Sequence, residues 1–198
     1  EIKFIIKNKL KFSSKDFWLT FDDGYIDHYK NVFPLLEKYH FKGSFFPSVN
    51  ILRYNKLMDV NVIQLILSKN INPNNILKDI ENLIKNYKYD LNYYLKKISY
   101  NNRFDNLKII QVKHLLQYLL PQNIRLKSIN YLQKKYLNTK KNNFYKNFYM
   151  KFDHLIKLKK SGHEIGMHGF NHTRLNQLSK EKLTKEILDT IKFWKKII

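Results

Sequence analysis

The sequence predicts an α/β protein in which a helical segment interrupts a framework of parallel strands. Near the N-terminus, β-prone apolar runs flank a single helical stretch, an order typical of a β–α–β unit with a right-handed crossover. From about residue 51 to residue 150, the apolar residues change to helical spacing. A helix, a short strand and a last helix then follow, so the framework resumes after the helical segment.

The N-terminal framework begins with a candidate strand at residues 2–6 and a second strand at residues 17–21. Residues 31–39 are expected to form a short helix. Pro34 is compatible with this helix because it would lie in the first turn, where its missing N–H costs nothing. A third strand is expected at residues 44–46, immediately before a proline.

The middle segment is expected to form helices and no strand. Asp59 can cap the first helix, in which the apolar residues as far as Leu67 lie on one face. Pro121 ends the third helix and can open the fourth, because proline fits the first turn of a helix. The apolar residues place the four helices at about residues 59–67, 76–87, 107–119 and 121–132.

The C-terminal framework is expected to comprise a helix at residues 152–158, which Gly162 ends, and a strand at residues 163–168. Ser179 can cap a last helix, with Glu181 favourable to the helix dipole in the first turn. The expected buried face of this helix consists of Leu183, Ile187, Ile191 and Trp194.

These elements divide the chain into three parts. Residues 1–50 and 151–198 are expected to form the two halves of one α/β core, and residues 51–150 a helical insertion. A chain of 198 residues with 43% hydrophobic residues can bury one such core. No apolar run reaches the roughly eighteen residues of a membrane span. Cysteine is absent, so only histidine and carboxylate side chains could hold a metal.

The formal net charge is +21, and the charge is unevenly distributed. From residue 91 to residue 152 there are thirteen Lys and Arg residues and a single acid, Asp105. Such a segment is either a solvated basic surface or a contact for an anionic partner, of which nucleic acid is the usual one. Because Lys, Asn, Ile, Tyr and Phe are all abundant, a codon bias would explain the charge without any partner. Nucleic-acid binding is therefore kept only as an alternative.

Two short stretches could carry chemistry. Asp22 and Asp23 follow an apolar run and precede Gly24, so an expected strand delivers two carboxylates at its C-terminal end. His168 and His172 are four residues apart at the end of another expected strand, a spacing that lets a tight loop hold one ion. With Asp23 as third ligand, coordination positions would stay open for water or substrate. Asp22 would then be free to act as a base.

Each stretch also has an ordinary explanation. Asp-Asp-Gly is common in solvent-facing turns, and two histidines four residues apart often bind no metal. The two stretches together favour a metal site, because each follows a hydrophobic run and contains or precedes a glycine.

The stretches Thr20-Phe21-Asp22-Asp23-Gly24 and His168-Gly169-Phe170-Asn171-His172 resemble the first two motifs of the polysaccharide deacetylase family, the NodB-homology carbohydrate esterases. The second stretch is preceded by Gly162-His163-Glu164-Ile165-Gly166, which adds to the resemblance. The similarity covers about residues 16–50 and 150–198 and extends to the branch found among bacterial surface-polysaccharide genes. It implies a distorted (β/α) barrel, here with a helical insertion between the motifs.

By position, the resemblance makes Asp22 the catalytic base and Asp23, His168 and His172 the ligands of a divalent metal, usually Zn²⁺. The implied function is metal-dependent hydrolysis that removes acetyl groups from an amino sugar or polysaccharide, and the implied partner is this carbohydrate. Because no signal-peptide pattern is visible, a cytoplasmic or membrane-associated bacterial protein is favoured over a secreted one.

The later motifs of the family, which supply an arginine beside the base and a histidine acid, have no counterpart that we can place in the chain. We therefore expect the N-terminal part of the catalytic domain, with an incomplete barrel and weak activity. A non-catalytic, sugar-binding remnant of the fold is a further alternative.

Two residues depart from the second motif, in which Ser or Thr usually follows the first histidine and Pro the second. Gly169 and Thr173 stand at these positions. The hydroxyl normally steadies the loop, so the resemblance implies a loop without this contact. Elsewhere, Tyr25 is expected to line the sugar site or to pack, His163 to form a structural hydrogen bond, and His28 to be a surface or hydrogen-bonded residue.

Overall fold

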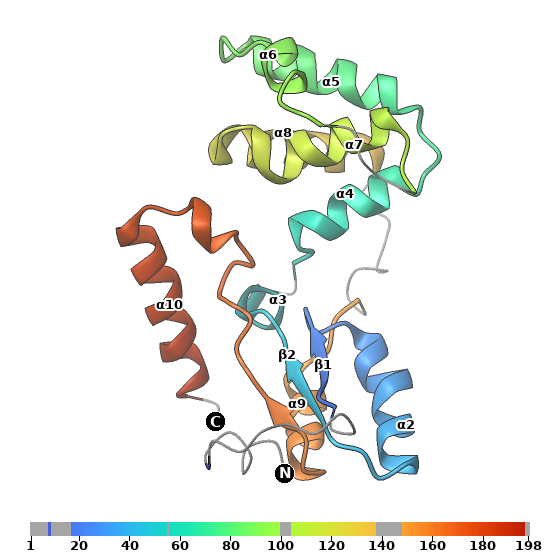
Figure 1. Ribbon diagram of the computed structural model, residues 1–198, viewed down its shortest axis with the longest axis vertical. Helices are drawn as coiled ribbons and strands as arrows, with labels where there is room; N and C mark the ends of the chain where they lie inside the picture. Colours follow the sequence, from blue (N-terminus) through green and yellow to red (C-terminus); the bar gives the residue numbers. More distant parts are fainter. Residues whose placement is uncertain (1–7, 9–16, 55, 100–103, 138–147, 197–198) are drawn as a thin grey trace. The chain divides into compact units, whose positions relative to one another are not determined.

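The computed structural model describes residue 8 and residues 17–54, 56–99, 104–137 and 148–196. It shows helices and a small parallel sheet, which confirms the α/β class and is compatible with a distorted NodB-type fold (Figure 1). The strand expected at residues 2–6 lies outside the described residues. Closure of the sheet into a barrel stays a prediction.

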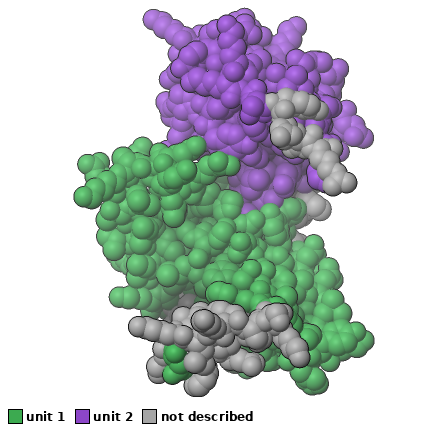
Figure 2. All heavy atoms as spheres, in the orientation of Figure 1, with its two compact units in different colours: residues 1–56, 143–198 green, residues 57–142 purple. Residues whose placement is uncertain are grey.

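The chain forms two compact units, coloured separately in Figure 2. The first unit comprises Glu1–Lys56 and Asn143–Ile198, and the second comprises Leu57–Asn142. The division into domains with boundaries after residues 50 and 150 stays a prediction. Among the described residues, no helix has both the length and the hydrophobicity that crossing a membrane requires.

Three parallel strands form the sheet of the first unit, in the order β1–β2–β3. β1 pairs with β2 along its whole length and ends with Asp22 opposite Phe46. Phe45 of β2 lies opposite Ile165 of β3. Because the strands are parallel, their carboxyl ends lie at one edge of the sheet. The strands span Leu19–Asp22 (β1), Gly43–Phe46 (β2) and Glu164–Ile165 (β3).

The strand expected at residues 163–168 is too long, because only the two residues of β3 pair with β2. The N–H of Gly166 still donates to the carbonyl of Phe45 at 2.8 Å, and the chain then leaves the sheet. A Cβ atom at Gly166 would collide with the ring of Phe46, so this position requires glycine. His163, which precedes β3, accepts a hydrogen bond from the N–H of Gly43 at 3.1 Å, as expected.

The helix expected at residues 31–39 begins earlier than predicted. A π-helical turn, η1 (His28–Val32), continues directly into α2 (Phe33–Lys38), and Pro34 lies in the first turn of α2. Ser179 caps the last helix by accepting a hydrogen bond from the N–H of Lys182, as expected. The other helices of this unit are α3 (Val49–Tyr54), α9 (Phe152–Lys160), the 3-10 turn η4 (Leu175–Gln177) and α10 (Lys180–Trp194).

The described residues of the second unit form helices and loops, as the apolar spacing predicts. Asp59 does not cap the first helix, because Met58 occupies the capping position and Asp59 lies in the first turn. Pro121 is the residue before α8. The helices are α4 (Asp59–Leu67), α5 (Pro73–Lys85), α6 (Leu91–Leu95), α7 (Leu107–His114) with the π-helical turn η2 (Leu115–Leu119), and α8 (Gln122–Tyr136).

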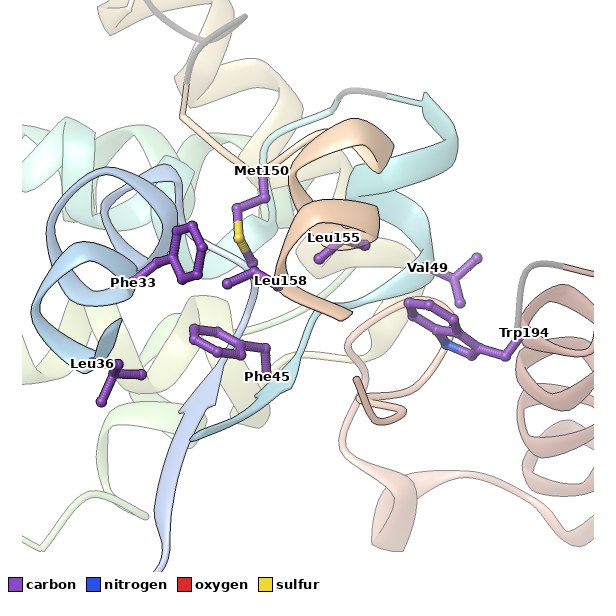
Figure 3. Packing of buried hydrophobic residues seen from close by; sticks show 8 residues of the cluster. All are labelled: Phe33, Leu36, Phe45, Val49, Met150, Leu155, Leu158 and Trp194. Atoms are coloured by element: carbon purple, nitrogen blue, oxygen red, sulfur yellow. The ribbon is translucent and has the colours of Figure 1, made fainter. Parts of the chain in front are cut away.

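The core of the first unit is built around Phe45 of the central strand. This side chain is fully buried, and its ring stacks on Phe21 of β1 with 4.9 Å between centroids. Figure 3 shows the helices α2 and α9 contributing apolar side chains to the same cluster, and Trp194 of α10 beside Val49 of α3. The buried members are Phe33, Leu36, Phe45, Val49, Met150, Leu155, Leu158 and Trp194.

The buried face expected for α10 is partly wrong. Ile187 is 44% exposed, whereas Glu186, Thr190 and Trp194 form the buried line of the helix. Two of these three residues are polar, so a partner for the Glu186 carboxylate is needed inside the unit. That partner is found in the loop after β3.

Replacing Phe45 by alanine tests the core. We expect Phe45→Ala to lower the free energy of unfolding by about 3–5 kcal/mol, because the change opens a cavity beneath the sheet. Urea unfolding followed by circular dichroism measures the effect. Leu35→Ala, at an exposed position of α2, is the control and should change stability by no more than about 0.5 kcal/mol. Equal effects of the two variants would contradict this description of the core.

Candidate metal centre

The chain turns sharply where β1 ends. Asp23 and Gly24 both have left-handed backbone conformations, with φ of 68° and 74°, and the N–H of Gly24 donates to the Asp22 carbonyl at 2.8 Å. A Cβ atom at Gly24 would lie 2.7 Å from Cβ of Pro47, so only glycine fits. Aspartate is one of the few other residues that tolerate positive φ, at a cost of roughly 1 kcal/mol or more. Strained residues of this kind are common at functional sites.

The turn brings Asp23 to the two histidines of the second motif. Its Oδ1 atom lies 3.3 Å from Nε2 of His168 and 3.0 Å from Nε2 of His172. One ligand atom from each residue lies within 4.8 Å of the other two. Around a tetrahedral ion with bonds of about 2.0–2.1 Å, neighbouring ligand atoms are about 3.4 Å apart, so the two distances from Asp23 to the histidines suit such an ion.

The three side chains are only partly buried. Their exposed fractions are 20% for Asp23, 32% for His168 and 29% for His172. A site of this kind leaves room for water or substrate beside an ion, unlike a closed structural site with four protein ligands. The carboxylate of Asp22 is exposed next to them and is close enough for its negative charge to act on His168. All four residues named from the sequence therefore lie in one place.

Hydrogen bonds dominate the electrostatics of this cluster. Bonds from His168 and His172 lower the pKa of Asp23 well below its ordinary range, and a bond from Tyr25 adds to this effect. The bond to Asp23 in turn raises the pKa of His168. A carboxylate that stays ionised between two imidazoles is the arrangement that a divalent cation needs.

The segment from His168 to His172, called here the histidine loop, is tied to the start of α3. The carbonyl of Gly169 accepts a hydrogen bond from the N–H of Val49 at 3.1 Å, and the carbonyl of Phe170 accepts one from the N–H of Asn50 at 2.8 Å. The loop carries two further left-handed residues, with φ of 74° at Gly169 and 53° at His172.

On its other side, the histidine loop contacts Glu186 of α10. The N–H groups of Phe170 and Asn171 both donate to Oε1 of Glu186, at 2.8 and 2.7 Å, and the Asn171 side-chain amide donates to Oε2 at 2.7 Å. Sequence reasoning missed Glu186, because it placed the apolar residues of α10 on the buried face. The sequence did contain one indication. Glu186, Thr190 and Trp194 are spaced four residues apart, so they lie on one face of the helix.

Tyr25 and His28 also lie near the site. The ring of Tyr25 stacks on Tyr149 with 5.8 Å between centroids, which confirms the packing that was one of its two expected roles, and a hydrogen bond joins its side chain to Asp23. His28 is half-buried against Phe21, and its Nδ1 atom is buried without a hydrogen-bond partner among the described residues. The expectation of a surface or hydrogen-bonded histidine is therefore wrong for this atom. Burial lowers the pKa of His28 despite the nearby carboxylates.

A family model for polysaccharide deacetylase matches residues 9–87 and 112–198, which make up well over half of the chain. The chain belongs to the polysaccharide deacetylase family. This confirms the resemblance inferred from the two motifs, both of which lie within the matched residues. The match is interrupted at residues 88–111, which lie within the second compact unit. No curated protein and no solved structure matches the chain.

The titration of His168 in metal-free protein tests the geometry of the centre. Asp23 stabilises the protonated imidazole, so His168 should titrate above its ordinary pKa of 6.5. Asp23→Asn, which tolerates the left-handed backbone, should lower that pKa. Histidine NMR shifts measured against pH give both values.

The same pairing predicts the direction of the pH effect on stability. The contribution from His168 is fully present below its unfolded pKa and is lost as the pH rises through the raised folded pKa. The stability difference between wild type and Asp23→Asn, measured without metal, should therefore be larger at about pH 5.5 than at about pH 8. A difference independent of pH would contradict the pairing.

Proposed function

We propose that this member of the polysaccharide deacetylase family is a metal-dependent hydrolase that removes acetyl groups from an amino sugar or polysaccharide, in the metabolism of bacterial surface polysaccharides. The observation that supports this most strongly is the convergence of Asp23, His168 and His172 beside the exposed Asp22. Membership of the family supports a carbohydrate substrate and cleavage of an amide bond.

Asp23, His168 and His172 would hold the divalent ion in this proposal. Two imidazole nitrogens and one carboxylate oxygen suit Zn²⁺, and the absence of cysteine excludes thiolate ligands. When bound, such an ion polarises the acetyl carbonyl and lowers the pKa of water in the site.

Asp22 is the proposed base. Its backbone is fixed by pairing with Phe46 and by the hydrogen bond from Gly24. The position from which its side chain extends is therefore fixed next to the three ligands. The exposed carboxylate can take a proton from water as the water oxygen attacks the acetyl carbon. The C–N bond then breaks, acetate is released, and the amine takes up the proton that Asp22 removed from water, either from Asp22 itself or through solvent. We propose weak turnover, because among the described residues no separate acid is assigned to protonate the amine as it leaves.

Nucleic-acid binding has less support. A phosphate backbone is bound by Lys and Arg side chains that are free to reach it. In the described part of the basic segment, two lysines are already paired with carboxylates within the chain. These pairs are Lys113 with Asp105 and Lys135 with Asp79.

Metal content is the first test of the proposal. Wild-type protein purified without chelator should contain about one equivalent of a divalent metal, whereas Asp23→Asn should contain less than roughly 0.2 equivalents. Elemental analysis of the purified proteins measures this. Asp22→Asn is the matched control, because it removes the neighbouring charge and should keep the metal. A wild type without metal, unresponsive to added Zn²⁺, would refute the metal-dependent function.

Acetate release is the second test. The metal-loaded wild type should release acetate from an oligomer of N-acetylated amino sugar, and Asp22→Asn should be slower by about a hundredfold or more while keeping its metal. An enzymatic acetate assay follows the reaction. Loaded wild-type protein that binds the sugar but releases no acetate would instead establish the non-catalytic, sugar-binding alternative.

A further inference from the structure

We propose that Glu186 is a positioning residue, which holds the histidine loop in the conformation that directs both imidazoles to Asp23. Its removal would weaken metal binding without removing any ligand. The inference rests on the proposed function, because it concerns metal binding by Asp23, His168 and His172.

The burial of Glu186 requires the histidine loop. The residue is only 6% exposed, and a buried carboxylate costs free energy unless its oxygens are hydrogen-bonded. All three hydrogen bonds that its carboxylate accepts from described residues come from Phe170 and Asn171. Hydrogen bonds to an ionised acceptor are stronger than neutral ones, so the loop and α10 stabilise each other.

The geometry of these bonds restricts the backbone between the two ligands. The N–H groups of two consecutive residues, Phe170 and Asn171, converge on the single oxygen Oε1, so the main chain must curl around it. Left-handed residues at Gly169 and His172 produce this curl. A Cβ atom at Gly169 would lie 3.4 Å from Oε1, which shows how closely the carboxylate approaches the loop.

The histidine loop is held from two sides, by α3 and by Glu186, so the loss of Glu186 would leave one side unsupported. The two loop carbonyls are bound by the start of α3, and the two loop N–H groups by Glu186. With both sides satisfied, the positions of the His168 and His172 backbones are set before any ion arrives, which is the role of supporting hydrogen bonds around metal ligands. Without Glu186, the N–H groups would need water, and the loop would no longer be held against α10.

The test compares three variants of the full chain. Glu186→Ala removes all three bonds and should raise the dissociation constant for Zn²⁺ by about 10–100-fold. Glu186→Gln keeps an oxygen that can accept from Phe170 and Asn171 but replaces the other oxygen with a donor, so its affinity should be intermediate. Thr190→Val is the matched control, because Thr190 is equally buried on the same helix and donates only to the Glu186 carbonyl, so its affinity should equal that of wild type.

Two further readouts separate positioning from general stability. The absorption spectrum of bound Co²⁺ reports ligand geometry and should change in Glu186→Ala but not in Thr190→Val. Amide hydrogen exchange of Phe170 and Asn171, measured without metal, should be slow in wild type and in Thr190→Val, and faster in Glu186→Ala. If Glu186→Ala does not fold, the affinity, Co²⁺ spectrum and amide exchange of Glu186→Gln decide the question.

The outcomes distinguish this inference from the proposed function. A wild type that binds no metal refutes the metal centre, and with it the inference. A wild type that binds metal, together with a folded Glu186→Ala of unchanged affinity and Co²⁺ spectrum, overturns the inference alone. Unchanged amide exchange in that variant would also overturn it, whatever the metal affinity.

Discussion

The parallel pairing of β1, β2 and β3 determines where every candidate ligand lies. Its register places Asp22 opposite Phe46 and Phe45 opposite Ile165, so three remote segments of the chain leave the sheet at the same edge. The turn after Asp22 and the loop after β3 meet there, and the segment after β2 binds that loop. A shift of one residue in this register would direct alternate side chains to the opposite face and separate Asp23 from the histidines.

Much of the fold could be predicted, because its local patterns agree with its tertiary structure. Strands β1 and β2 are apolar runs that end at turn residues, and the longer helices have regular apolar spacing. The errors in the predicted element boundaries arise where a contact between residues distant in sequence determines the local structure. β3 ends at Ile165, and the chain leaves the sheet after Gly166, where the Phe46 ring leaves no room for a side chain. No local pattern contains that contact. The start of the first helix was missed because a π-helical turn extends it to His28.

The candidate ligands could be found from sequence because each motif combines an apolar run, a glycine and adjacent polar residues. Their meeting at one point could only be proposed, since it depends on strand order. Glu186 could not be found in this way. The neighbouring residues Ile187 and Leu188 are apolar but exposed, so the apolar spacing of α10 indicates the wrong buried face. The burial of an acid at Glu186 is explained only by the histidine loop that binds it. The burial of His28 against Phe21 is likewise a tertiary contact that local spacing does not reveal.

The connection between β2 and β3 contains an entire compact unit of helices. The entropy lost in closing a connection grows only with the logarithm of its length, so doubling or halving it changes the cost by only about 0.6 kcal/mol. Natural variation can therefore enlarge, shrink or exchange this part with little penalty, provided that its two ends still return to the sheet. The family match is interrupted inside this unit, at residues 88–111, whereas residues 57–87 and 112–142 of the unit lie within the match. A change of length at residues 88–111 would leave both ends of the unit, and with them the return of the chain to the sheet, as they are.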